Sequence, residues 1–126
     1  MFKTILQSIA ILGVISAPAF ADGDAEKGKK VFNKCKACHA VGDDAKNKVG
    51  PILNGIVDAP AGQVEDFKYS KALTEMAADG LVWDDETLTA YLKKPKDVIK
   101  GGSMSFAGLR KDDDIADVIA YLSENE

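Results

Sequence analysis

The chain has 126 residues, of which 46% are hydrophobic and 29% are charged, and its formal net charge at pH 7 is −4. This length allows one domain at most, and the composition excludes a disordered tail or a fibrous protein. The negative charge argues against nucleic-acid binding, which usually requires a strongly basic domain.

The N-terminal segment has the pattern of an export signal. Lys3 precedes an apolar run over residues 5–15, and Ala19-Phe20-Ala21 matches a small-x-small cleavage site. An uncleaved membrane anchor is the alternative, but the run is shorter than the roughly 20 residues that span a bilayer. We therefore expect cleavage after Ala21, export to the periplasm without stable membrane insertion, and one mature domain over residues 22–126.

A first helix, expected over about residues 24–34, leads into the sequence Cys-Lys-Ala-Cys-His at residues 35–39. This C-x-x-C-H spacing is the attachment signature of c-type haem. Residues three apart share one face of a helix end, so the thiols of Cys35 and Cys38 can add to the two vinyl groups on one edge of a porphyrin. His39 can then bind the iron from one face. The motif predicts one covalent haem c.

Two other uses of the cysteines fit less well. A thioredoxin-like dithiol requires a strand before the motif, and none is visible. A zinc site requires four ligands, and Cys35, Cys38 and His39 are one short. Because the chain has one histidine, bis-histidine ligation of a haem is excluded. The sixth iron ligand would therefore be a methionine, a lysine or water, or the position would be open.

The remaining sequence predicts helices separated by long loops, without a convincing strand. The glycines and prolines of residues 40–67 indicate an irregular segment that could wrap one edge of a cofactor. Further helices are expected over residues 70–78, after Asp84 or Asp85, from Pro95 to Ile99 and from about Asp112. The prediction is an all-α fold of about four to five helices, with long loops wrapped around one covalent haem.

The two methionines that follow the expected signal lie in different contexts. Leu73, Met76 and Ala77 have the spacing of one helix face, which is typical of core packing. Met104 lies in the irregular, glycine-rich segment 100–108, whose backbone can approach a porphyrin closely. We predict Met104 as the sixth ligand, with Met76 or an open site as alternatives.

Across residues 22–126 the chain resembles the class I c-type cytochromes, in the branch of cytochrome c2 and mitochondrial-type cytochrome c. The matching residues are Gly28, Phe32, the haem motif, Gly50-Pro51, Phe67, Tyr69, Ser70, Trp83, Tyr91, Pro95, Met104, Val118 and Tyr121. The resemblance implies the cytochrome c fold, in which the N-terminal helix crosses the C-terminal helix.

The resemblance also implies roles for four residues near the haem. The carbonyl of Pro51 would accept a hydrogen bond from His39 and fix its ring. Tyr69 and Trp83 would bind the haem propionates, and Tyr91 would lie near the axial methionine. Without the resemblance, the three aromatic residues could equally be core side chains with satisfied polar tips.

Three positions depart from the family pattern. The family usually has an arginine shortly after the Gly-Pro pair, whereas residues 57–59 are Val-Asp-Ala. Leu73 replaces a frequent asparagine, and Gly102 replaces a threonine two residues before the axial methionine. These changes leave the haem potential open, while the predicted ligands are present.

Lysines flank both parts of the expected haem site. They are Lys27, Lys29, Lys30, Lys34 and Lys36 around the motif, and Lys93, Lys94, Lys96 and Lys100 before Met104. They form either a merely solvated surface or a positive rim that steers an acidic partner. The resemblance implies a monomeric electron carrier, not an enzyme, with a cytochrome bc1 complex, a terminal oxidase or a photosynthetic reaction centre as partner.

Two competing hypotheses follow from the same residues. A loosely held Met104 would give a haem enzyme or gas sensor with an open distal site, recognised by rapid carbon monoxide binding. Retention of residues 1–21 would give a membrane-tethered partner of one dehydrogenase or oxidase.

Overall fold

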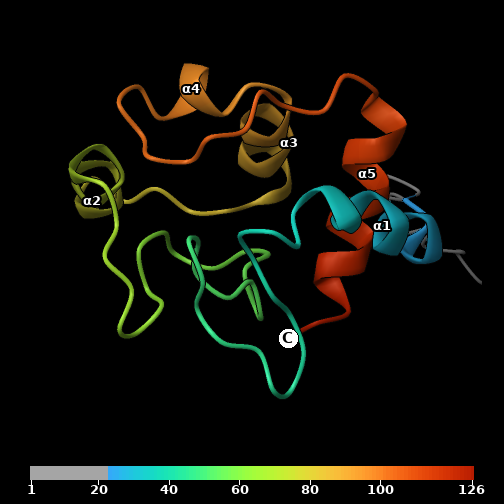
Figure 1. Ribbon diagram of the computed structural model, residues 1–126. Helices are drawn as coiled ribbons and strands as arrows, with labels where there is room; N and C mark the ends of the chain where they lie inside the picture. The colour runs from blue at the N-terminus through green and yellow to red at the C-terminus, as the bar shows by residue number, and fades with distance from the viewer. Residues whose placement is uncertain (1–22) are drawn as a thin grey trace, which may run out of the picture.

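The computed structural model describes residues 23–126, so the expected export signal lies outside the described residues. Figure 1 shows the helices α1 (Ala25–Val31), α2 (Lys71–Ala78), α3 (Asp85–Lys93), α4 (Pro95–Val98) and α5 (Asp112–Ser123), and a 3₁₀ helix, η1 (Phe32–Lys34), follows α1. In this part of the chain, strand-like pairing is limited to an isolated bridge between Pro60 and Val82. The predicted all-α class is confirmed.

Side chains next to the helix starts explain where these helices begin. Asp24, Ser70 and Asp84 each accept hydrogen bonds from amides in the first turn of α1, α2 and α3. Such caps satisfy amides that have no partner within the helix. Pro95 occupies the first position of α4, where its missing N–H removes no helical hydrogen bond.

The first helix differs from the continuous helix expected over residues 24–34. The α-helix ends at Val31, and the 3₁₀ turn η1 follows. In this turn the amide of Cys35 donates to the carbonyl of Phe32 at 2.8 Å. Phe32 is 2% exposed and packs on Tyr121, with ring centroids 5.5 Å apart. The tighter turn therefore keeps Phe32 in the core while the chain redirects toward the cysteines.

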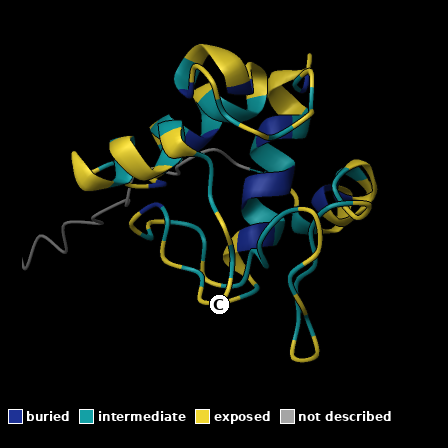
Figure 2. Ribbon diagram, turned by 60° about the vertical axis from the view of Figure 1, so that its left-hand side comes forward, coloured by how far each residue is buried: buried dark blue, intermediate teal, exposed yellow. Residues whose placement is uncertain are grey.

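Helix α1 packs across α5, as the resemblance implies (Figure 1). A Cβ on Gly28 would overlap the carbonyl oxygen of Asp117 and lie 2.8 Å from the Cβ of Tyr121, so only glycine permits this approach. On α5, the buried face consists of Ile115, Val118, Ile119 and Leu122, and the buried turns of this helix stand out in Figure 2. These residues are those that the helical spacing predicts.

The long segment between η1 and α2 contains no helix, as expected, and is coloured cyan to green in Figure 1. Backbone hydrogen bonds tie it to the connection between α2 and α3: Ala61 donates to Leu81 at 2.9 Å, and Trp83 donates to Ala59 at 2.8 Å. The amide of Gly55 donates to the carbonyl of Asn125 at 2.7 Å. No helix within residues 23–126 is both long and apolar enough to cross a membrane.

Candidate functional site

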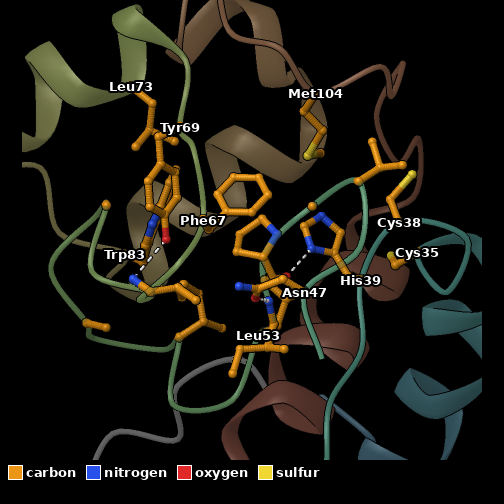
Figure 3. A pocket seen from close by; sticks show the side chains of 18 of the residues that line it. Cys35, Cys38, His39, Asn47, Leu53, Phe67, Tyr69, Leu73, Trp83 and Met104 are labelled. Carbon is orange, nitrogen blue, oxygen red and sulfur yellow. Dashed lines mark hydrogen bonds between the residues drawn. The ribbon is translucent and has the colours of Figure 1, made fainter. Parts of the chain in front are cut away.

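A cavity of about 790 Å³ lies among the long segment, α3 and the segment that follows α4 (Figure 3). Small-molecule sites in proteins span roughly 300–1,000 Å³ and are mostly apolar. The lining includes all eight residues predicted for the site: Cys35, Cys38, His39, Pro51, Tyr69, Trp83, Tyr91 and Met104. Aliphatic side chains from distant parts of the chain complete it, among them Leu53, Leu73, Leu88, Ile99 and Leu122. The fold therefore gathers the predicted residues around one apolar space.

The two cysteines follow η1 and lie at one side of the cavity (Figure 3). The amides of Cys38 and His39 both donate to the carbonyl of Cys35, at 3.1 and 2.8 Å, which makes a tight turn. Both cysteines are free and half-buried. Burial, and secondarily the nearby Cys38, raises the pKa of Cys35. Two thiols are therefore presented to the cavity from one turn.

The ring of His39 is held by a single hydrogen bond. Its Nδ1 lies 2.7 Å from the carbonyl oxygen of Pro51. Because a carbonyl can only accept, Nδ1 carries the proton and Nε2 keeps a free lone pair in the neutral ring. Burial lowers the pKa of His39, whereas the bond to Pro51 opposes this shift. The arrangement favours a neutral imidazole of fixed orientation, which is the form that binds a metal.

Met104 enters the cavity from the irregular segment after α4 (Figure 3). The hydroxyl of Tyr91 donates to its Sδ at 3.4 Å. Burial raises the pKa of Tyr91, so its phenol keeps the proton that it donates. Met76, the alternative ligand, packs against the hydrophobic core and does not line the cavity.

Tyr69 and Trp83 line another part of the cavity. The hydroxyl of Tyr69 accepts a hydrogen bond from the amide of Val64 at 2.9 Å, and its ring packs edge-on against Phe67. Trp83 is 5% exposed and packs on Tyr91, with ring centroids 4.8 Å apart. Both side chains line the cavity and also pack against other aromatic rings, so they can serve the core and a ligand at once.

Two asparagines that the sequence analysis did not select shape the long segment. Asn47 accepts from the amide of Ile52 at 2.9 Å and donates to the carbonyl of Glu65 at 3.1 Å. Asn54 makes a reciprocal pair of hydrogen bonds with the backbone of Gly42. Asparagine in a glycine-rich loop is the sequence signal for such backbone pairing, but the signal does not identify the partner.

The charged residues that line the cavity are few. They are Lys34, Lys46, Glu65 and Asp66.

Two departures from the family pattern lie in or near the cavity. Leu73 lines the cavity, at a position where the resemblance implied asparagine. The expected arginine is replaced by Asp58 and its neighbours, and Asp58 donates its amide to the carbonyl of Trp83 at 2.8 Å. This segment therefore contacts Trp83 through its backbone.

The donor set fits an iron porphyrin. Two thiols lie together at one side of a large apolar cavity, and an imidazole and a thioether point into it. Within residues 23–126, no group of three or more histidine, cysteine, aspartate or glutamate side chains could hold a metal by itself.

Comparison with known proteins gives concordant results. The family model of cytochrome c matches residues 25–126. Cytochrome c2 of Rhodomicrobium vannielii is 48% identical over 118 residues, which cover 91% of this chain and 92% of the relative. Cytochrome c2 of Agrobacterium tumefaciens is 46% identical over 101 residues, which cover 80% and 91%. The structure of cytochrome c2 from Rhodospirillum centenum superposes with a TM-score of 0.77 at 39% identity, covering 82% of this chain and 98% of that one.

The matches span nearly all of the described chain, and they include the segments that carry the cavity. The chain therefore belongs to the cytochrome c family, in its cytochrome c2 branch, and is an electron carrier, not an enzyme, with one haem c attached covalently through Cys35 and Cys38.

Proposed function

We propose that this cytochrome is a monomeric periplasmic one-electron carrier whose haem iron is bound by His39 and Met104. The observation that carries the proposal is that both side chains reach one cavity from distant parts of the chain, each held by a second residue. Pro51 orients the imidazole, and Tyr91 contacts the sulfur. Ligands held in this way need little rearrangement when the iron changes its charge.

The chemistry of this ligand pair suits electron transfer. The bound haem supplies a reversible one-electron change at its iron. A thioether ligand raises the reduction potential, and two protein ligands leave no vacant position for oxygen or peroxide. The cavity lining is mostly apolar, so a bound haem would be largely shielded from water.

Surface charge supports an acidic partner, though the rim of the cavity is mixed. Lys34 and Lys46 line the cavity, as do Glu65 and Asp66. The lysines on both sides of the motif and before Met104 are exposed. Such a surface suits a transient encounter with a cytochrome bc1 complex, a terminal oxidase or a photosynthetic reaction centre, which are the partners that the family implies.

Replacement of the sixth ligand tests the proposal. In Met104→Ala holoprotein, we expect complete loss of the sulfur-to-iron charge-transfer band of the ferric spectrum. Met76→Ala is the matched control, because Met76 packs against the core and does not line the cavity, and it should keep the band. If Met104→Ala retained the band, Met104 would not be the ligand. The mass of the same periplasmic preparation shows whether cleavage occurs after Ala21.

A further inference from the structure

The segment that carries Met104 is fixed to the fold at both ends. Before it, the amide of Gly102 donates to the carbonyl of Ile99 at 3.1 Å. After it, the amide of Leu109 donates to the carbonyl of Leu92 in α3 at 2.8 Å, and Leu109 is 2% exposed. We term residues 103–108 the methionine arm. The arm is flanked by these two backbone hydrogen bonds, which fix the positions of its ends.

Gly108 brings the end of the methionine arm directly against α3. A Cβ at this position would overlap the carbonyl oxygen of Lys93, and would lie 2.8 Å from the carbonyl carbon of Lys93 and 3.3 Å from the carbonyl oxygen of Leu92. These are backbone atoms of the last turn of α3, so rotation of a side chain cannot relieve the overlap. Any side chain at residue 108 must therefore move the arm or the helix.

Helix α3 is the more firmly fixed of the two. Leu88 is 4% exposed, and Tyr91 packs on the buried Trp83. The same helix presents the Tyr91 hydroxyl to the Met104 sulfur. Displacement of the arm away from α3 would therefore separate Tyr91 from Met104 and stretch the Leu109–Leu92 hydrogen bond.

We propose that Gly108 is a positioning residue for Met104: its close approach to the end of α3 sets the reach of the methionine arm and so holds the sulfur in the haem cavity. This inference rests on the proposed role of Met104 as ligand. With a side chain at residue 108, a larger fraction of molecules would have the Met104 sulfur withdrawn from the iron. An external ligand would then bind the vacant sixth position with higher apparent affinity, in proportion to that fraction.

The experiment compares two alanine variants of the ferric holoprotein. Gly108 has φ +114° and Gly42 has φ +113°, but a Cβ on Gly42 would have no atom within 4 Å. Both variants thus place an alanine at nearly the same positive φ, while only Gly108→Ala creates the overlap. The probe is imidazole, titrated while the charge-transfer band is recorded. We expect the apparent affinity for imidazole to rise about tenfold or more in Gly108→Ala, and to stay within about twofold of wild type in Gly42→Ala.

The outcomes separate this inference from the proposed ligation. A wild-type protein without the band would contradict Met104 ligation, on which the inference depends. A wild-type protein with the band, together with an unchanged imidazole affinity in Gly108→Ala, would overturn the inference alone. Equal effects in the two variants would also overturn it, because backbone strain would then be the cause.

A second variant covers the case in which Gly108→Ala does not yield folded holoprotein. One glycine inserted between Phe106 and Ala107 lengthens the methionine arm and leaves the contact of Gly108 with Lys93 intact. If the fixed reach of the arm holds the sulfur, this insertion should also raise the imidazole affinity about tenfold. An insertion variant with wild-type affinity would contradict the inference.

Discussion

The hydroxyl of Tyr91 donates a hydrogen bond to the Met104 sulfur at 3.4 Å. It comes from α3, while the methionine comes from the irregular segment after α4. A hydrogen bond donated to a thioether withdraws electron density from the sulfur. In the proposed ligation by Met104, the sulfur would then stabilise ferric iron less, so this contact would favour the ferrous state.

Removal of the hydroxyl should therefore lower the reduction potential. In Tyr91→Phe we expect a decrease of tens of millivolts, at most about 60 mV, since a hydrogen bond contributes about 0.5–1.5 kcal/mol and about 59 mV corresponds to a tenfold change for one electron. A spectroscopic redox titration measures it. Tyr121→Phe is the control, because Tyr121 packs on Phe32 outside the cavity. A raised potential in Tyr91→Phe would contradict this account.

The residues of the site were predictable to different degrees. Cys35, Cys38 and His39 are adjacent in sequence, so their spacing alone predicts the attachment of haem. Met104 could be chosen over Met76 because one lies in a glycine-rich segment and the other on a helix face. The Asn47 contacts could not be predicted, since they join residues that only the folded loop brings together, Ile52 and Glu65.

At the scale of elements, local chemistry determines where most helices begin. Asp24, Ser70, Asp84 and Pro95 mark the starts of four helices, and all four are visible in the sequence. The 3₁₀ turn after Val31 was missed, because burial of Phe32 against Tyr121 is a tertiary effect. Capping residues can therefore be predicted from the sequence. The change from an α-helix to a 3₁₀ helix at Val31 cannot, because it depends on tertiary packing.

Asp84 offers a test of this local control. Hydrogen bonds from the side chain and backbone of Thr87 lower the pKa of Asp84 below its ordinary value of 3.8. A carboxyl with a lowered pKa in the folded state stabilises the fold above its ordinary pKa, and this contribution is lost as the pH falls through the folded value. We expect Asp84→Ala to unfold at lower denaturant concentration than wild type at neutral pH, with a difference that shrinks in acid.

The matched control is Asp84→Asn. Asparagine keeps a side-chain oxygen that can accept from the amide of Thr87, but it does not titrate. It should be more stable than Asp84→Ala at neutral pH, and its small deficit against wild type should disappear once the pH falls below the lowered pKa of Asp84 in the folded protein. Denaturant unfolding of the three holoproteins at neutral and acidic pH measures both differences. A wild-type advantage over Asp84→Ala that persisted undiminished in acid would show that ionisation of the cap is not involved.

At the scale of the whole molecule, the crossing of α1 and α5 was predictable and the path of the long segment was not. Helical spacing identifies the buried face of α5, and Gly28 marks the contact. The segment between η1 and α2 follows no periodic pattern, and its path depends on contacts such as Gly55 with Asn125. Many residues of this segment line the haem cavity. A bound haem would therefore provide the apolar surface on which the segment packs, in place of a protein core.

The distribution of charge is also a property of the whole molecule, and it leads to a prediction about partner encounter. Lys46 lines the cavity, whereas Lys111 lies before α5 and does not. Lys46→Glu and Lys111→Glu change the net charge equally, so any difference between them reports local charge at the cavity. We expect Lys46→Glu to slow reduction by membranes that contain a cytochrome bc1 complex by about two- to tenfold at low salt, in stopped-flow measurements. Screening should remove most of this effect at about 1 M salt, where the Debye length is about 3 Å. Equal slowing by Lys111→Glu would mean that net charge, not a rim at the cavity, controls the encounter.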